Sequence, residues 1–342
     1  MLIAPRGNEN HRKGFALAFG SLDIILFDGK HDEVILNLIQ CTKSTEGTEK
    51  WAESRRDAVK ALTNVGTKLS DYLSTEMLHH IYDCFMISLE DYTLDRRGDV
   101  GAWVREAAMT GIEQFTLKLL NTSPQRIPPA IVAQFMPCLA QQAVEKIDRT
   151  RGVAGRIFHA LLHAKSAEGS CIPGIRDRDT LESVFPADRD VKWAVESESF
   201  PLFVKLLRLK NYNERLLLGL VVSVGGLTER LVKNSSQCLF NELGGMNSAG
   251  IKQFCTNILG LFHTSQKNDR VTVPMLKFLD LVFTSSSLSA VLQDESSEFP
   301  ISLLNLVKAE ISKCGDPNKL MASSEIFCQL LQVQHLVLNF KI

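Results

Sequence analysis

The apolar side chains of this chain recur at the spacing of an amphipathic α-helix along almost its whole length. Alternation of apolar and polar residues, the pattern of a half-buried strand, is nowhere sustained. Short segments with a charged start and an apolar continuation also recur. Their reference residues are Arg12, Arg56, Arg105, Arg151, Arg215 and Arg270. The pattern therefore predicts repeated helices.

The intervals between these segments are 44, 49, 46, 64 and 55 residues. The first three are close to the roughly 40–47 residues of a HEAT-type pair of helices. The interval of 64 is longer because it contains a long irregular segment. One such pair cannot bury its own apolar face, so neighbouring pairs must stack into a continuous core. We therefore predict an all-α fold, a HEAT/armadillo-type α-solenoid of stacked helical hairpins.

One long segment, residues 166–198, interrupts the helical pattern. It contains two glycines, two prolines and scattered charges, and we expect few apolar anchors in it. Irregular segments longer than about 15 residues are often functional or mobile. We therefore expect helical repeats at residues 1–165, an irregular insertion at 166–198 and further helical repeats at 199–342.

The composition argues against several classes of protein. The net charge of −1 gives no bulk attraction to nucleic acid or to an anionic membrane. The longest apolar run, residues 216–224, is far shorter than the roughly 20 residues of a membrane span. The eight cysteines form no C-x-x-C pair, so we expect free thiols in a reducing, cytoplasmic compartment. We expect no nucleic-acid partner and no membrane span.

No group of residues in the sequence predicts catalysis or a bound cofactor. His159 and His163 are four residues apart on a predicted helix, but a zinc site needs a full ligand set, so a structural role is favoured. Gly225–Gly226 and Gly244–Gly245 match neither phosphate-binding motif, and we interpret both pairs as helix ends. We expect no catalytic residue, no metal and no cofactor.

A charged turn precedes a strongly amphipathic helix in residues 95–109. Asp99 is placed to accept from the free backbone N–H groups of the first helical turn. Arg105 can reach back to Asp99 or to an acidic group on a neighbouring repeat. Trp103 lies in the apolar stripe, so we expect it in the core, and paired alanines would let a second helix approach closely.

The charged turn has two interpretations. The first is an exposed loop between helices, in which aspartate caps the helix and an Asp–Arg pair links two repeats. The second is a contact with a partner, because polar loop residues on a rigid scaffold often carry recognition. The residues of this second interpretation are Asp95, Arg96, Arg97 and Asp99.

Three stretches are specific enough to compare with known families. They are RGDVG followed by WVR and AAM within residues 97–109, LLLGLVVSVGGLTE at 216–229 and NDRVTVPMLK at 268–277. All three resemble the tubulin-folding cofactor D family, and the resemblance runs from about Lys13 to near the C-terminus. It implies that the chain is the C-terminal portion of a larger protein.

The resemblance implies a non-catalytic tubulin-folding chaperone that captures β-tubulin. With cofactors E and C, members of the family assemble and disassemble the αβ-tubulin heterodimer, in association with an Arf-like small GTPase. GTP hydrolysis by tubulin is promoted only by the assembled cofactors. A cytoplasmic, microtubule-associated location and a role in microtubule biogenesis are implied as well.

The alternative function is that of a generic HEAT-repeat adaptor or scaffold for transport or phosphatase complexes. Such a protein would share the helical periodicity but not the long motifs.

Overall fold

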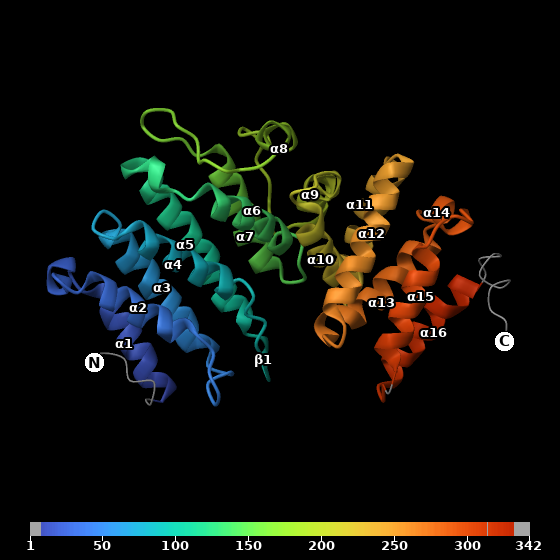
Figure 1. Cartoon of the computed structure of the whole chain (residues 1–342), viewed down its shortest axis with the longest axis horizontal. Helices are drawn as coiled ribbons and strands as arrows, with labels where there is room; N and C mark the ends of the chain where they lie inside the picture. Colours follow the sequence, from blue (N-terminus) through green and yellow to red (C-terminus); the bar gives the residue numbers. More distant parts are fainter. Residues whose placement is uncertain (1–7, 313, 332–342) are drawn as a thin grey trace. The chain divides into compact units, whose positions relative to one another are not determined.

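The computed structural model describes residues 8–312 and 314–331 of the chain. Within these residues the structure has sixteen α-helices and a single two-stranded hairpin, so the all-α prediction is confirmed. The chain divides into two compact units (Figure 1). Unit 1 comprises residues 1–139 and 152–189, and unit 2 comprises residues 140–151 and 190–342.

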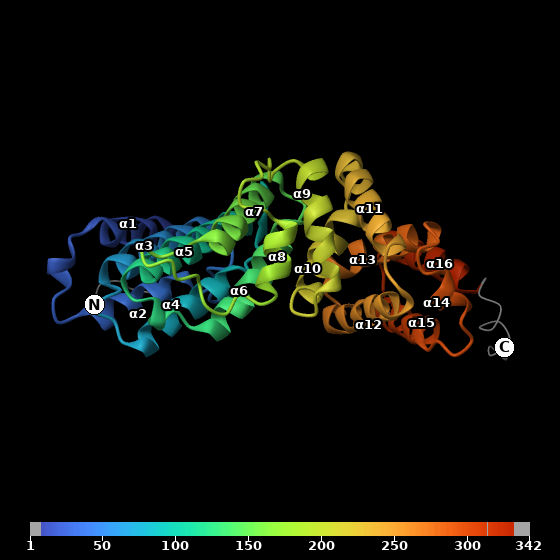
Figure 2. The same ribbon diagram turned by 90° about the horizontal axis from the view of Figure 1, so that it is seen from above.

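Unit 1 is built from two layers of helices. Helices α1, α3 and α5 lie side by side in one layer, and α2 and α4 form the other (Figure 2). The helices between residues 9 and 184 are α1 (Glu9–Ser21), α2 (His31–Thr42), α3 (Ala52–Leu69), α4 (Thr75–Ser88), α5 (Gly101–Thr122), α6 (Pro129–Gln142), α7 (Asp148–His163) and α8 (Arg178–Val184). The division between the units falls within α6 and α7. Short 3₁₀ turns lie at η1 (Ile24–Phe27) and η2 (Pro124–Arg126).

Unit 2 repeats the layered arrangement. Helices α10, α13 and α16 stack in one layer, and α12 stacks on α15 in the other. Its elements are α9 (Glu196–Phe203), η3 (Val204–Arg208), α10 (Asn213–Val224), α11 (Glu229–Gly244), α12 (Ser248–Ser265), α13 (Asp269–Thr284), α14 (Ser289–Gln293), α15 (Phe299–Ile311) and α16 (Pro317–Leu331).

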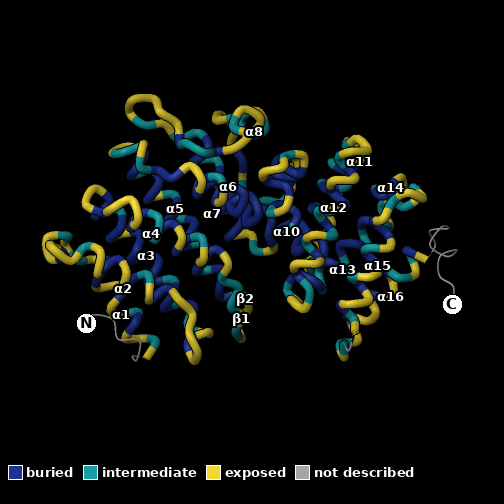
Figure 3. Tube along the Cα trace, viewed as in Figure 1, coloured by how far each residue is buried: buried dark blue, intermediate teal, exposed yellow. Residues whose placement is uncertain are grey.

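Apolar and aromatic side chains form the core of each unit. Figure 3 colours each residue by burial and shows buried stretches along the helices. In unit 1 the ring of Phe115 lies 5.2 Å from that of Tyr82 and 6.3 Å from that of Phe85. The Tyr82 hydroxyl is 2.9 Å from the Thr116 hydroxyl, so its buried polar tip is satisfied. This burial raises the pKa of Tyr82 above its usual range.

Two of the sequence stretches that resemble cofactor D contact each other in unit 2. Helix α10 ends at Val224, and the next residue, Gly225, packs directly against the Pro274 carbonyl of α13. A Cβ atom at Gly225 would overlap that carbonyl oxygen. Gly225 therefore ends the helix, as expected, and also permits a close backbone approach between two helices.

The irregular segment after α7 is better anchored than its sequence suggests. Ile172, Leu181 and Phe185 are each at most 1% exposed, so the expectation of few apolar anchors is wrong. The Nε2 atoms of His159 and His163 lie 3.0 and 2.7 Å from the carbonyl oxygens of residues 186 and 185. Since a carbonyl only accepts, both rings donate and hold the segment on α7.

The part of the chain that the structure describes contains neither a candidate metal site nor a candidate membrane span. Its histidine, cysteine and carboxylate side chains form no group of three or more that could hold a metal ion. In the same residues, every helix is too short or too polar to cross a membrane.

Gly225 provides a test of the packing between α10 and α13. Gly225→Ala is expected to lower the free energy of unfolding by about 1–3 kcal/mol or more, because the added methyl group overlaps a backbone carbonyl. Gly260→Ala is the matched control, because a Cβ there would meet nothing within 4 Å, and alanine should stabilise α12 by about 0.5–1 kcal/mol. Urea unfolding measures both. Equal effects of the two substitutions would contradict the close approach.

Candidate functional site

The charged turn forms a small antiparallel hairpin between α4 and α5. Strand β1 (Leu94–Asp95) pairs with β2 (Gly98–Asp99), and Asp95 lies opposite Gly98. Gly98 has a φ of 103°, a backbone conformation that residues with a Cβ rarely adopt. This geometry places Arg96 and Arg97 in the exposed turn.

A buried ion pair between Asp99 and Arg105 lies at the base of the hairpin. Arg105 Nη1 and Nη2 each lie 3.1 Å from an Asp99 carboxylate oxygen, and the two side chains are 1% and 5% exposed. Nη1 also donates to the Asp91 carbonyl at 2.7 Å, and the guanidinium lies 4.1 Å from the centre of the Tyr92 ring. Asp99 in addition accepts from the backbone N–H of Ala102 at 3.2 Å. The predicted Asp99–Arg105 contact and capping bond are therefore both present.

A second buried arginine holds the chain that leads into the hairpin. Arg55 of α3 donates from Nε to the Asp91 carboxylate and from Nη2 to the Thr93 hydroxyl, both at 2.7 Å. The reference residue of this repeat, Arg56, is about one quarter exposed, and the buried arginine is its neighbour Arg55.

The exposed side of the hairpin carries a chain of ion pairs that crosses three elements. Arg97 Nη2 lies 2.7 Å from Asp95 Oδ2, and Arg97 Nη1 lies 2.9 Å from Glu53 Oε1 of α3. The other Glu53 oxygen lies 2.6 Å from Lys13 Nζ of α1. The Arg97 guanidinium also lies 4.8 Å from the centre of the Trp103 ring. The hairpin, α1, α3 and α5 are therefore linked at this surface.

These contacts shift the titration of two carboxyl groups. Hydrogen bonds from Lys13 and then from Arg97 lower the pKa of Glu53 to about 2. The hydrogen bond from the Arg97 side chain likewise lowers the pKa of Asp95. Both groups are therefore carboxylates at neutral pH, and the surface carries paired charges of both signs.

Two residues of this surface are open to a partner. Arg96 is exposed and makes no hydrogen bond or ion pair with any residue that the structure describes. Trp103 is half-buried, so the expectation of a core position is only partly met: its ring is flanked by Arg97 and, at 6.0 Å, by Arg56. The turn thus carries one exposed cation without a partner among the described residues, Arg96, next to Arg97, whose guanidinium covers the partly exposed Trp103 ring.

Comparison with known proteins identifies the family. Residues 133–319, more than half of the chain, match the family described as "Tubulin folding cofactor D C terminal". The chain belongs to the tubulin folding cofactor D family. This confirms the resemblance, and the matched region includes the stretches at 216–229 and 268–277 that meet at Gly225.

Individual relatives agree with this assignment. The chain is 26% identical over 272 residues to "Tubulin-specific chaperone D" of Dictyostelium discoideum, which covers 68% of the chain and 18% of that protein. It is 28% identical over 116 residues to "Tubulin-folding cofactor D" of Schizosaccharomyces pombe, which covers 32% of the chain and 10% of that protein. The chain therefore spans less than one fifth of the length of these cofactor D relatives.

Of the four residues that the sequence singled out in this cofactor D family member, two face the protein and two face solvent. Asp99 is buried in its pair with Arg105, and Asp95 is occupied by Arg97. The sequence analysis did not select Lys13 or Glu53 for this surface. The repeat interval could have indicated Lys13, because stacked repeats place the start of α1, which carries Lys13, beside the start of α3.

The pair of Asp99 and Arg105 provides a second prediction. Arg105→Met would leave the Asp99 carboxylate buried without its cation, so we expect it to cost about 3–5 kcal/mol of unfolding free energy. Arg96→Met in the same hairpin removes an exposed, unpartnered cation and should change stability by no more than about 0.5 kcal/mol. Chemical denaturation compares them. An Arg105→Met variant as stable as Arg96→Met would refute the structural role of the pair.

A third prediction follows from the low pKa of Glu53. The pKa is about 2 in the folded chain and roughly 4.3 in an unfolded chain, so the unfolded state binds the proton more readily between these values. This stabilisation is complete above the unfolded pKa and is lost as the pH falls toward 2. We expect Glu53→Gln to melt below the wild type at pH 6 and the difference to shrink at pH 3. A difference that is unchanged or larger at pH 3 would contradict the assignment.

Proposed function

We propose that this chain takes part in tubulin folding as a non-catalytic chaperone segment that binds β-tubulin. The observation that carries the proposal is the family match over residues 133–319. Both cofactor D relatives carry tubulin in their names, and the three sequence stretches that resemble the family support the same conclusion. The chain corresponds to less than one fifth of those relatives, so it supplies one part of the complete activity.

Within this proposal the chain works with cofactors E and C in assembling and disassembling the αβ-tubulin heterodimer, together with an Arf-like small GTPase. It has no catalytic residues of its own, and it promotes GTP hydrolysis by tubulin only within the assembled complex. Its place of action is the cytoplasm and the microtubule cytoskeleton, where it supports microtubule biogenesis.

The proposed tubulin contact is the exposed face of the hairpin in unit 1. It combines the unpaired guanidinium of Arg96, the guanidinium of Arg97 and the half-buried ring of Trp103. Arginine and tryptophan are the residue types that most often dominate binding energy at interfaces. The buried pairs of Arg55 and Arg105 hold the hairpin in place, so little ordering is needed when a partner binds.

Arg96→Glu tests this contact with little risk to the fold. We expect it to reduce capture of purified αβ-tubulin several-fold in a pull-down, because it places a negative charge where the proposed interface needs a cation. Its melting temperature should stay close to that of the wild type, since Arg96 has no partner among the described residues. Lys233→Glu, an equal charge reversal at an exposed residue of α11, is the matched control and should leave capture unchanged.

The outcomes separate the two candidate functions and the two interpretations of the turn. Capture of tubulin by the wild type and its loss in Arg96→Glu would support the proposal. Capture that is equal in both variants would remove the hairpin from the interface. No retention of tubulin by the wild-type chain would favour the generic helical-repeat adaptor.

A further inference from the structure

The turn between α5 and α6 carries the only serine or threonine of the sequence that is directly followed by proline. The pair is Ser123–Pro124. Ser123 lies directly after α5, and Pro124 is the first residue of η2. The neighbouring residues Asn121, Thr122 and Gln125 are exposed. The pair therefore lies in a surface turn between two helices of unit 1.

The side-chain hydroxyl of Ser123 is uncommitted in the folded chain. It makes no hydrogen bond with any residue that the structure describes, and it is not one of the buried side-chain oxygens, so it is open to solvent. The adjacent Thr122 hydroxyl differs, because it donates to the Lys118 carbonyl at 3.1 Å. The backbone of Ser123 is fixed, since its N–H donates to the Leu119 carbonyl at 2.8 Å. A free hydroxyl thus lies on a well-placed backbone.

The local backbone suits an enzyme that reads an extended chain. Ser123 has a φ of −155° and a ψ of 66°, outside the helical region, as expected for a residue whose successor is proline. Kinases that modify serine before proline bind their substrate in an extended conformation and meet the next residue with an apolar surface. Proline has no backbone N–H, so it leaves no unpaired donor against that surface, whereas other residues do.

We propose that Ser123 is a phosphate acceptor for a proline-directed serine/threonine kinase. Its Oγ attacks the γ-phosphorus of ATP held by the kinase, and a new O–P bond forms. The bond from that phosphorus to the bridging oxygen breaks, ADP leaves, and the hydroxyl proton passes to the catalytic base of the kinase. The modified serine carries close to two negative charges at neutral pH.

Arg126 is the cation that a phosphate on Ser123 recruits. In the unmodified chain its guanidinium donates to the Ser70 carbonyl at 2.8 Å and to the Leu73 carbonyl. Since Ser70 ends α3, Arg126 ties the turn after α5 to the end of a neighbouring helix. Hydrogen bonds from arginine to phosphate are stronger than those to a neutral carbonyl. Phosphorylation therefore draws Arg126 away from α3 and loosens the link between two repeats.

This site is separate from the proposed tubulin contact. The hairpin precedes α5 and Ser123 follows it, and a helix of 22 residues is about 33 Å long. The proposal also uses no residue of the hairpin, so either proposal can fail without the other.

The first test measures phosphate incorporation into the folded full-length chain. The purified chain is incubated with a proline-directed kinase, Mg²⁺ and ATP, and the modified residues are mapped by mass spectrometry. We expect phosphate at Ser123. Pro124→Ala keeps the hydroxyl but restores a backbone N–H, so modification of Ser123 should be at least about tenfold slower. A synthetic peptide of residues 117–130 shows that the kinase is active.

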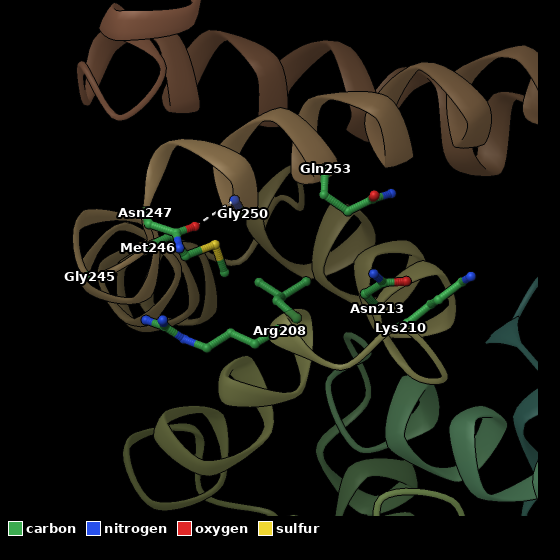
Figure 4. A pocket seen from close by; sticks show the side chains of 9 residues that line it. Arg208, Lys210, Asn213, Gly245, Met246, Asn247, Gly250 and Gln253 are labelled. Atoms are coloured by element: carbon green, nitrogen blue, oxygen red, sulfur yellow. Dashed lines mark hydrogen bonds between the residues drawn. The ribbon is translucent and has the colours of Figure 1, made fainter.

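Ser248→Ala is the matched control. Ser248 is exposed at the start of α12 and follows Asn247, which lines the pocket in Figure 4 and accepts from the Gly250 N–H at 2.8 Å. Alanine, not proline, comes after Ser248. Incorporation into Ser248→Ala should therefore equal that into the wild type.

The second test follows the end of α3 by hydrogen–deuterium exchange. Peptides that cover residues 67–74 should exchange faster in the phosphorylated chain, because Arg126 has left its carbonyl partners. Arg126→Gln should show the same faster exchange without phosphate, and phosphorylation of this variant should add little. Circular dichroism checks that Arg126→Gln and Pro124→Ala fold.

Three results would overturn the inference. Absence of phosphate at Ser123 in the folded chain would show that the fold withholds this hydroxyl. Equal rates for the wild type and Pro124→Ala would show that the proline is not read. Unchanged exchange of residues 67–74 after complete phosphorylation would remove Arg126 from the response.

Discussion

The structure of unit 1 depends on arginine side chains that are buried between neighbouring helical hairpins. Burying a guanidinium is costly unless its N–H groups and its charge are both satisfied. Arg105 meets this requirement with Asp99 and with a backbone carbonyl, and Arg55 meets it with Asp91 and Thr93. Because all of these partners lie between residues 91 and 99, the hairpin cannot shift without unpairing two buried charges. This constraint holds the turn that carries Arg96 and Arg97 in a fixed position.

A buried arginine recurs in unit 2, where the 1%-exposed Arg151 donates from Nη1 to the Glu145 and Lys146 carbonyls and pairs with Glu196. Its Nε is buried without a partner among the described residues, so this guanidinium is less completely satisfied than that of Arg105.

Helical periodicity was sufficient to predict the fold class, because a 3.6-residue pattern shows which face of each helix is buried. It was not sufficient for residues 166–198. Up to the start of α9, the segment contains only one short helix, α8, so its other buried side chains, such as Ile172, lie on an irregular path that has no repeating face.

The candidate site was predictable in part. Turn chemistry and spacing located the charged turn and the bond from Arg105 to Asp99, which are local in sequence. The contact from Glu53 to Arg97 spans 44 residues, and only the stacking of repeats brings it about. Trp103 shows a related limit. The apolar stripe predicted which face of α5 carries Trp103. It could not predict that Arg56 and Arg97 flank the ring, because these arginines belong to other elements.

The central claim is that the hairpin face of unit 1, held by buried arginines, contacts tubulin. Hydrogen–deuterium exchange of the chain with and without saturating αβ-tubulin tests it most directly, because exchange reports protection segment by segment. The account predicts slower exchange in peptides that cover residues 94–103 when tubulin is bound. Unchanged exchange of these peptides in a chain that is demonstrably bound to tubulin would contradict it.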